Sequence, residues 1–113
     1  MEEKILYLSL KKEWFDLIKA GVKREEYREM KPYWEKRLVE KTESIRLYNS
    51  PWEQPCTDMV KYTFKKFTHV VFRNGYDDKK PMMKFKITKM SIGEGNPELG
   101  APKGEDVLII KFE

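Results

Sequence analysis

Runs of apolar residues with a period of two predict several strands along this chain. The stretch 82–92 shows the pattern best, because its apolar phase moves from Phe85 and Ile87 to Met90 and Ile92. Side chains alternate strictly along a strand, so this slip of one residue predicts a β-bulge near Thr88-Lys89. The stretches that we expect to form strands are Ile5–Leu10, Lys23–Arg28, Ser44–Tyr48, Thr68–Arg73, Met82–Ile92 and Val107–Phe112.

Two stretches predict helices. Lys11–Ala20 has Trp14, Leu17 and Ile18 at helical spacing, and Gly21 is the residue that typically ends a helix in a left-handed turn. Pro32–Leu38 begins with a proline, which suits the first turn of a helix. The stretch Thr57–Phe67 is open between one helical turn and irregular structure. Loops are expected at Ser50–Cys56 and Gly93–Gly104, and a tight turn at Asn74-Gly75.

Length and composition restrict the class of protein. A chain of 113 residues predicts a single domain, 1–113. Several strands with few helices predict an α+β fold built on a small, mostly antiparallel barrel. The formal charge of +4 is compatible with a polyanionic partner without requiring one. A single cysteine, no basic leader and no long apolar run lead us to expect a cytoplasmic protein that is not a membrane protein.

One short motif stands where the first helix gives way to a strand. Gly21-x-Lys23-x-x-Glu26-x-Arg28 resembles the signature of the ASCH domain family, and the resemblance extends to the opening strand and helix, the middle strands and the last strand. It implies a PUA-like β-barrel with two or three helices and an association with RNA. The segment from about 40 to 66 fits the family least and is expected to be an insertion.

Some ASCH-like proteins are amidohydrolases that act on N4-acetylcytidine, and others have been linked to RNA cleavage. Their pattern has a lysine that corresponds to Lys23, but a threonine nucleophile where this chain has Glu26. A later glutamate completes that site, and Glu94 and Glu98 are both candidates for it.

The residues of the motif support a ligand site independently of the resemblance. Glu26 and Arg28 lie two apart on one face of the expected strand, where they can form an ion pair. Glu26 can accept a hydrogen bond from the amino group of a base, and Lys23 and Arg28 can each hold a phosphate. The alternative is a surface ion pair that only links the strand to the helix and binds no ligand.

A second constellation, Arg73, Asn74 and Tyr76, follows a strand at a turn. Arg73 can pair with phosphate, Asn74 can bind a base edge, and Tyr76 can stack on a base; a plain hairpin is the alternative. Trp14 is expected in the core. Trp52, between two prolines, is either packed against the protein or exposed as a contact surface. The lone His69 is expected to be structural, so we expect no metal and no cofactor.

Three functions follow as hypotheses. The first is a module that binds RNA or a nucleotide-like small molecule through Lys23, Glu26 and Arg28, with Arg73, Asn74 and Tyr76 close by. The second is a hydrolase of a modified nucleoside or of RNA, in which Lys23 activates a nucleophile or stabilises an oxyanion and Glu26 is the base. The third is an adaptor that binds a protein partner through the loop around Trp52.

Overall fold

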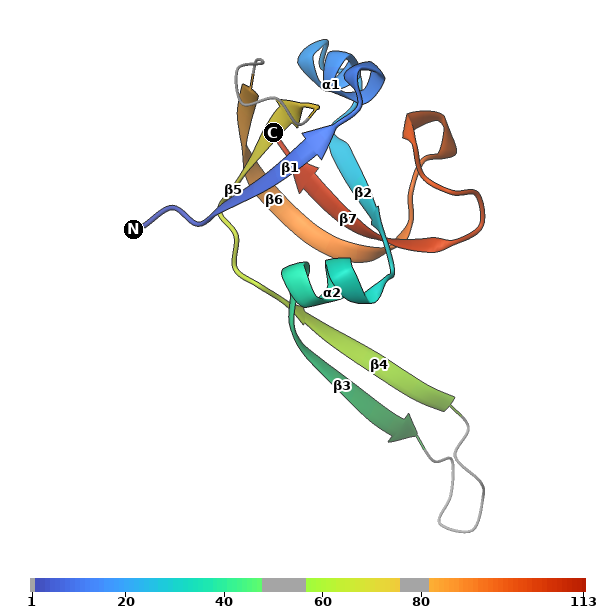
Figure 1. Cartoon of the computed structure of the whole chain (residues 1–113). Coiled ribbons are helices and arrows are strands. Elements are labelled where there is room, and N and C mark those ends of the chain that lie inside the picture. The colour runs from blue at the N-terminus through green and yellow to red at the C-terminus, as the bar shows by residue number, and fades with distance from the viewer. Residues whose placement is uncertain (1, 48–56, 76–81) are drawn as a thin grey trace. The chain divides into compact units, whose positions relative to one another are not determined.

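The computed structural model describes residues 2–47, 57–75 and 82–113, with the side chains of 44–47 and 57–59 left out of the description (Figure 1). The chain divides into two compact units. The first contains Met1–Met30 and Lys66–Glu113, and the second contains Lys31–Lys65. The prediction of a single domain stays a prediction, and the two units are described in turn.

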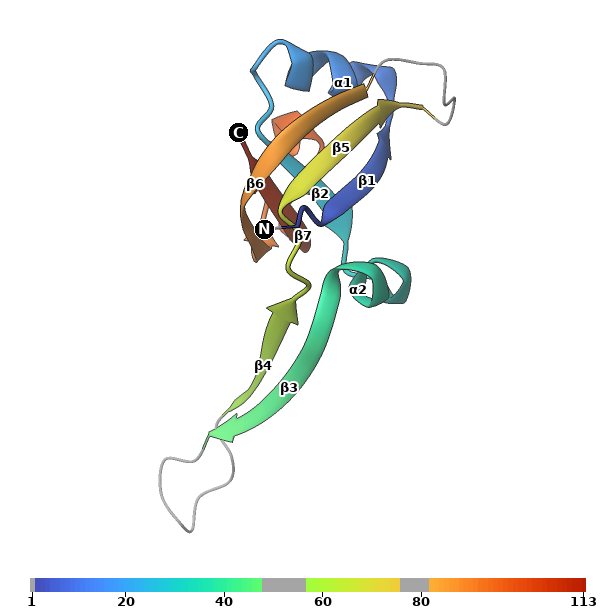
Figure 2. The same cartoon turned by 90° about the vertical axis from the view of Figure 1, so that its left-hand side faces the viewer.

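The first unit is built on a curled five-stranded sheet with the order β1-β5-β6-β7-β2 (Figure 2). Its strands are β1 (Ile5–Leu10), β2 (Glu25–Glu29), β5 (His69–Asn74), β6 (Met82–Glu94) and β7 (Asp106–Phe112). β1 and β5 are parallel, and the other three pairs are antiparallel. An α+β fold with a mostly antiparallel sheet is therefore confirmed, as a half-barrel whose edge strands are β1 and β2.

The core of this unit follows from the alternation along β7. Leu108, Ile110 and Phe112 are buried on one face, while Val107 and Ile109 are buried on the other. β7 is therefore buried on both faces, as its apolar sequence predicts, and its two edges pair with β6 and β2. The bulge in β6 is confirmed, because the register with β7 shifts between Ile87 and Lys89.

Helix α1 (Lys12–Lys19) packs on the sheet through Phe15 and Ile18, which are its buried residues. Trp14 and Leu17 are only half-buried, so the expected burial of Trp14 in the core is wrong. Gly21 has φ +79°, which confirms the left-handed turn expected after the helix. This turn brings the chain into β2 two residues later than predicted, and Lys23 therefore precedes the strand.

The second unit contains α2 (Pro32–Leu38), β3 (Val39–Leu47) and β4 (Thr57–Phe64). β3 and β4 form an antiparallel pair in which Glu43 lies opposite Lys61. The expectation of a helical turn or irregular structure over Thr57–Phe67 is wrong for Thr57–Phe64, and only residues 65–67 lack regular structure. Strand β4 exists because β3, ten residues earlier in the chain, supplies its ladder, and opposite charges on facing positions favour that register.

Two loop predictions need correction. The expected loop 93–104 is partly regular, because β6 continues to Glu94 and Pro97–Leu99 forms the 3₁₀ turn η1. Gly75 has the positive φ of a turn, but the connection to β6 continues into residues outside the described part of the chain. None of the helices in residues 2–47, 57–75 and 82–113 is long and apolar enough to cross a membrane.

Candidate functional site

Lys23 is a fully buried lysine at the edge of the first unit's sheet. Its side chain is 1% exposed, and its Nζ lies 3.1 Å from Glu26 Oε1. Nζ also donates to the carbonyl of Leu99 at 2.5 Å and lies over the rings of Trp14 and Tyr27, 4.5 and 5.2 Å from their centroids. A carboxylate, a carbonyl and two aromatic faces thus replace the water around this ammonium group.

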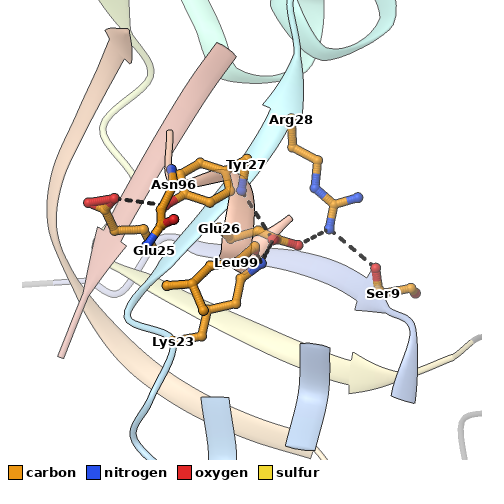
Figure 3. A network of polar contacts seen from close by, with 8 residues as sticks. All are labelled: Ser9, Lys23, Glu25, Glu26, Tyr27, Arg28, Asn96 and Leu99. Atoms are coloured by element: carbon orange, nitrogen blue, oxygen red, sulfur yellow. Dashed lines mark hydrogen bonds and ion pairs between the residues drawn. The ribbon is translucent and has the colours of Figure 1, made fainter. Parts of the chain in front are cut away.

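Glu26 is the centre of the network (Figure 3). Its Oε1 accepts from Lys23 Nζ and from the backbone N–H of Tyr27 at 3.1 Å, and its Oε2 accepts from Arg28 Nη2 at 2.7 Å. A carboxylate has about four acceptor positions, and these contacts use three of them. One position on Oε2 remains for a further donor.

Arg28 connects the two edges of the half-barrel. The same Nη2 that binds Glu26 also donates to the carbonyl oxygen of Ser9 on β1, at 3.2 Å. β1 and β2 are not neighbours in the sheet, so this side-chain contact spans the gap between them (Figure 3). The predicted ion pair of Glu26 and Arg28 is present, and it lies on the buried face beside Ile110 and Leu108.

A pocket of about 490 Å³ opens between these two edges. We call it the edge pocket. Its charged lining contains three cations and two carboxylates, which leaves a net positive charge. Trp14 supplies an aromatic surface, and the lining residues are Ser9, Leu10, Lys11, Trp14, Lys23, Glu26, Tyr27, Arg28, Glu29, Gly75 and Gly100. The three residues of the motif therefore converge on one concavity.

The loop between β6 and β7 is fixed to this network at two points. Leu99 accepts from Lys23, and the backbone N–H of Asn96 donates to the Tyr27 hydroxyl at 3.1 Å. The hydroxyl in turn donates to Glu25 at 3.0 Å. Burial raises the pKa of Tyr27, the Asn96 N–H opposes this, and the Glu25 carboxylate adds to it.

The second predicted constellation is not gathered at the edge pocket. Arg73 and Asn74 do not line it, and the guanidinium of Arg73 lies over the ring of Tyr7, 5.2 Å from its centroid. Their neighbour Gly75 does line the pocket, while Tyr76, Trp52 and Cys56 lie outside the described residues.

The candidates for the later glutamate of the amidohydrolase pattern are Glu94, at the end of β6, and Glu98, in the β6–β7 loop. Both are exposed, and neither lines the edge pocket. The residues of that loop that sequence reasoning missed are Leu99 and Gly100. Gly100 has a positive φ of +105°, which lets the chain pass close to Trp14 and Lys23. The glycines of the stretch 93–104 were the only signal in the sequence for this close approach.

His69 lies away from the edge pocket, with its Nδ1 2.9 Å from the Thr68 hydroxyl. Within the described part of the chain, no three His, Cys, Asp or Glu side chains are grouped closely enough to hold a metal ion. No family model, curated protein or solved structure matches this chain. Its function must therefore be inferred from the pocket and its residues.

Proposed function

We propose that this protein binds RNA or a nucleotide-like small molecule in the edge pocket. The observation that carries the proposal is the convergence of Lys23, Glu26 and Arg28 on one concavity with a net positive charge beside the Trp14 indole. An aromatic face and a guanidinium suit a base and a phosphate. The remaining acceptor position on Glu26 suits an amino group on the base edge.

The roles within the motif are unequal under this proposal. Lys23 is buried and bonded to Glu26 and Leu99, so it acts as a positioning residue for the carboxylate. Arg28 is 18% exposed, and Lys11 is an exposed residue that lines the pocket. These two cations are therefore the residues that contact phosphate.

Fluorescence anisotropy with a labelled single-stranded RNA, titrated at several salt concentrations, tests this proposal. Lys11→Gln and Arg28→Gln are each expected to weaken binding and to reduce the log–log salt slope by about one unit. Lys89→Gln, an exposed lysine on β6 that does not line the edge pocket, is the matched control. Equal binding by all three variants and the parent protein would reject the assignment. Lys11 lies outside the buried network, so its variant stays informative if Arg28→Gln unfolds.

Hydrolysis is the second candidate function, and the buried contact of Lys23 with Glu26 favours it. A lysine and a glutamate in a partly dry pocket can stabilise an oxyanion and accept a proton. The test is incubation with N4-acetylcytidine and with short RNA, with and without Mg²⁺ or Mn²⁺, followed by chromatography. A product that disappears in Glu26→Gln supports the enzyme, and RNA binding without any product supports the binding module.

A further inference from the structure

A second, smaller pocket of about 180 Å³ lies in the first unit between the end of α1 and strands β6 and β7. We call it the aromatic pocket. Its volume is close to that of a cavity known to admit benzene, so it fits a ligand of one ring and not a nucleotide. Its lining residues are Ile18, Lys19, Gly21, Lys23, Arg24, Met83, Phe85, Phe112 and Glu113.

The floor of the aromatic pocket is apolar. Ile18 and Phe112 are buried, and Phe85 is half-buried with its ring 5.0 Å from that of Phe112. The third ring of this cluster, Phe72, is completely buried. Phe85 therefore offers aromatic surface to a ligand, and the energy of covering it favours an apolar body.

The rim of the aromatic pocket is charged, and it contains two exposed cations and the acidic residue Glu113. Lys19 and Arg24 are exposed, and their side chains form no ion pair within the described residues. The ammonium of Lys23 does not count here, because it is bound to Glu26 on the edge-pocket side.

The C-terminal end of α1, which would disfavour an anion, is largely capped at this place. Backbone N–H groups fold back onto its last carbonyls: Ala20 donates to Asp16, Gly21 to Ile18, and Val22 and Lys23 both donate to Leu17. These bonds occupy three of the last four carbonyl oxygens of the helix, which carry the negative end of its dipole. Lys19 and Arg24 add two positive charges at this end.

We propose that the aromatic pocket binds a small carboxylic acid with an apolar body, of about the size of benzoate. The ring or short chain packs against Ile18, Phe85 and Phe112, and the carboxylate accepts hydrogen bonds from Arg24 and Lys19. The two pockets share Lys23 in their linings, but Arg24 and Phe85 line only the aromatic pocket.

The test is an NMR titration of the full, isotopically labelled chain with benzoate and with benzamide, its uncharged analogue. Benzoate is expected to give saturable shifts of the amide signals of Ile18–Arg24, Met83–Phe85 and Phe112. Arg24→Gln is expected to weaken benzoate binding about tenfold, the loss of one charge-assisted hydrogen bond. Glu113→Gln is expected to strengthen it, because it removes the side-chain carboxylate of Glu113 from the rim. Benzamide binding should respond to neither variant, and Lys89→Gln should leave benzoate binding unchanged.

Several outcomes would overturn this proposal: no saturable shifts with benzoate, equal affinity for benzamide, or the same benzoate affinity in Arg24→Gln as in the parent protein. Arg24 and Glu113 are both exposed, so their variants are expected to fold, and a thermal melt of each one checks this. RNA binding at the edge pocket is measured separately, so failure here leaves the proposed function untouched.

Discussion

At the scale of residues, Lys23 poses a specific energetic problem. A lysine that loses its water is stable only when other groups replace the solvent around its charge. Glu26, the carbonyl of Leu99 and two aromatic rings do so here. Glu26 is itself buried and depends on Lys23 and Arg28 in the same way. The three side chains therefore form one energetic unit, and the removal of any one affects the other two.

Replacement of Lys23 by methionine tests this unit. Lys23→Met keeps most of the aliphatic stem but leaves Glu26 with one cation fewer, and is expected to lower the free energy of unfolding by about 3 kcal/mol. Urea unfolding followed by circular dichroism measures the loss. Adding Glu26→Gln should cost less in this variant than in the parent protein, because the carboxylate has already lost one of its two cations. Lys89→Met, at an exposed position, is the control. An equally small effect at both positions would contradict the energetic coupling of Lys23, Glu26 and Arg28.

The ionisation of Tyr27 gives a second residue-scale prediction. Its pKa is raised in the folded protein, so the unfolded chain loses the hydroxyl proton first as the pH rises. The neutral form thus contributes stability that is complete below the ordinary pKa of about 10 and is lost above it. Tyr27→Phe should make unfolding less dependent on pH above about pH 10. Thermal melts from pH 8 to 11 measure this difference, and identical slopes in the two proteins would contradict it.

Only part of the site could be predicted from its residues. The spacing of Glu26 and Arg28 predicts their ion pair, and Gly21 predicts the turn that precedes Lys23. The carbonyl partners, Ser9 on β1 and Leu99 in the β6–β7 loop, could not be predicted, because any residue type has a carbonyl. The prediction for Arg73 failed for a different reason. Its side-chain type suits a phosphate site, but its position on β5 places the guanidinium over Tyr7.

At the scale of elements, the β6–β7 loop is held against β2 by contact as well as by hydrogen bonds. A Cβ on Gly95 would lie 2.5 Å from Tyr27 Cε1 and 2.7 Å from the Cβ of Ala101. Gly95→Ala is therefore expected to lower the free energy of unfolding by about 1–3 kcal/mol through overpacking. Gly93→Ala is a matched control two residues away, where the nearest atom, Ile109 Cδ1, is 3.9 Å from the new Cβ.

The control is expected to be neutral or to stabilise the protein by up to about 1 kcal/mol, because alanine restricts the unfolded chain. Chemical unfolding measures both variants. Hydrogen exchange at Asn96 then reports whether the loop has separated from Tyr27, since this amide donates to the Tyr27 hydroxyl. Equal stability of the two variants would contradict the close packing of Gly95 against β2.

The helices and strands could be predicted where they depend on the pattern of residues adjacent in the sequence. The strand pattern of β1, the proline at the start of α2 and the phase slip in β6 depend on neighbouring residues alone. β4 depends on a partner, β3, that the pattern of its own eight residues does not specify. The edge pocket is also non-local, because it requires β1 and β2, the two ends of the strand order, to approach each other.

At the scale of the whole molecule, the two units differ in how their strands are supported. In the first, β5, β6 and β7 each have a neighbour on both sides. In the second, the described sheet contains only β3 and β4, so each strand is hydrogen-bonded on one side. A two-stranded ribbon is only marginally stable alone in water. The resistance to local opening is therefore expected to differ between the units.

Native-state hydrogen exchange measures this difference directly. Of Thr42 and Glu43 in the second unit, the amide that is hydrogen-bonded to β4 is expected to exchange by local opening. Its exchange should be at least about 100-fold faster than that of Val70–Phe72 and Leu108–Ile110, which need global unfolding. Added urea should accelerate the core amides strongly and the β3 amide only slightly, because local opening exposes little surface. Equal protection and equal urea dependence in both units would mean that they unfold as one cooperative body. Variants of the second unit would then also be expected to destabilise the edge pocket, whereas separate opening confines their effect to the hairpin.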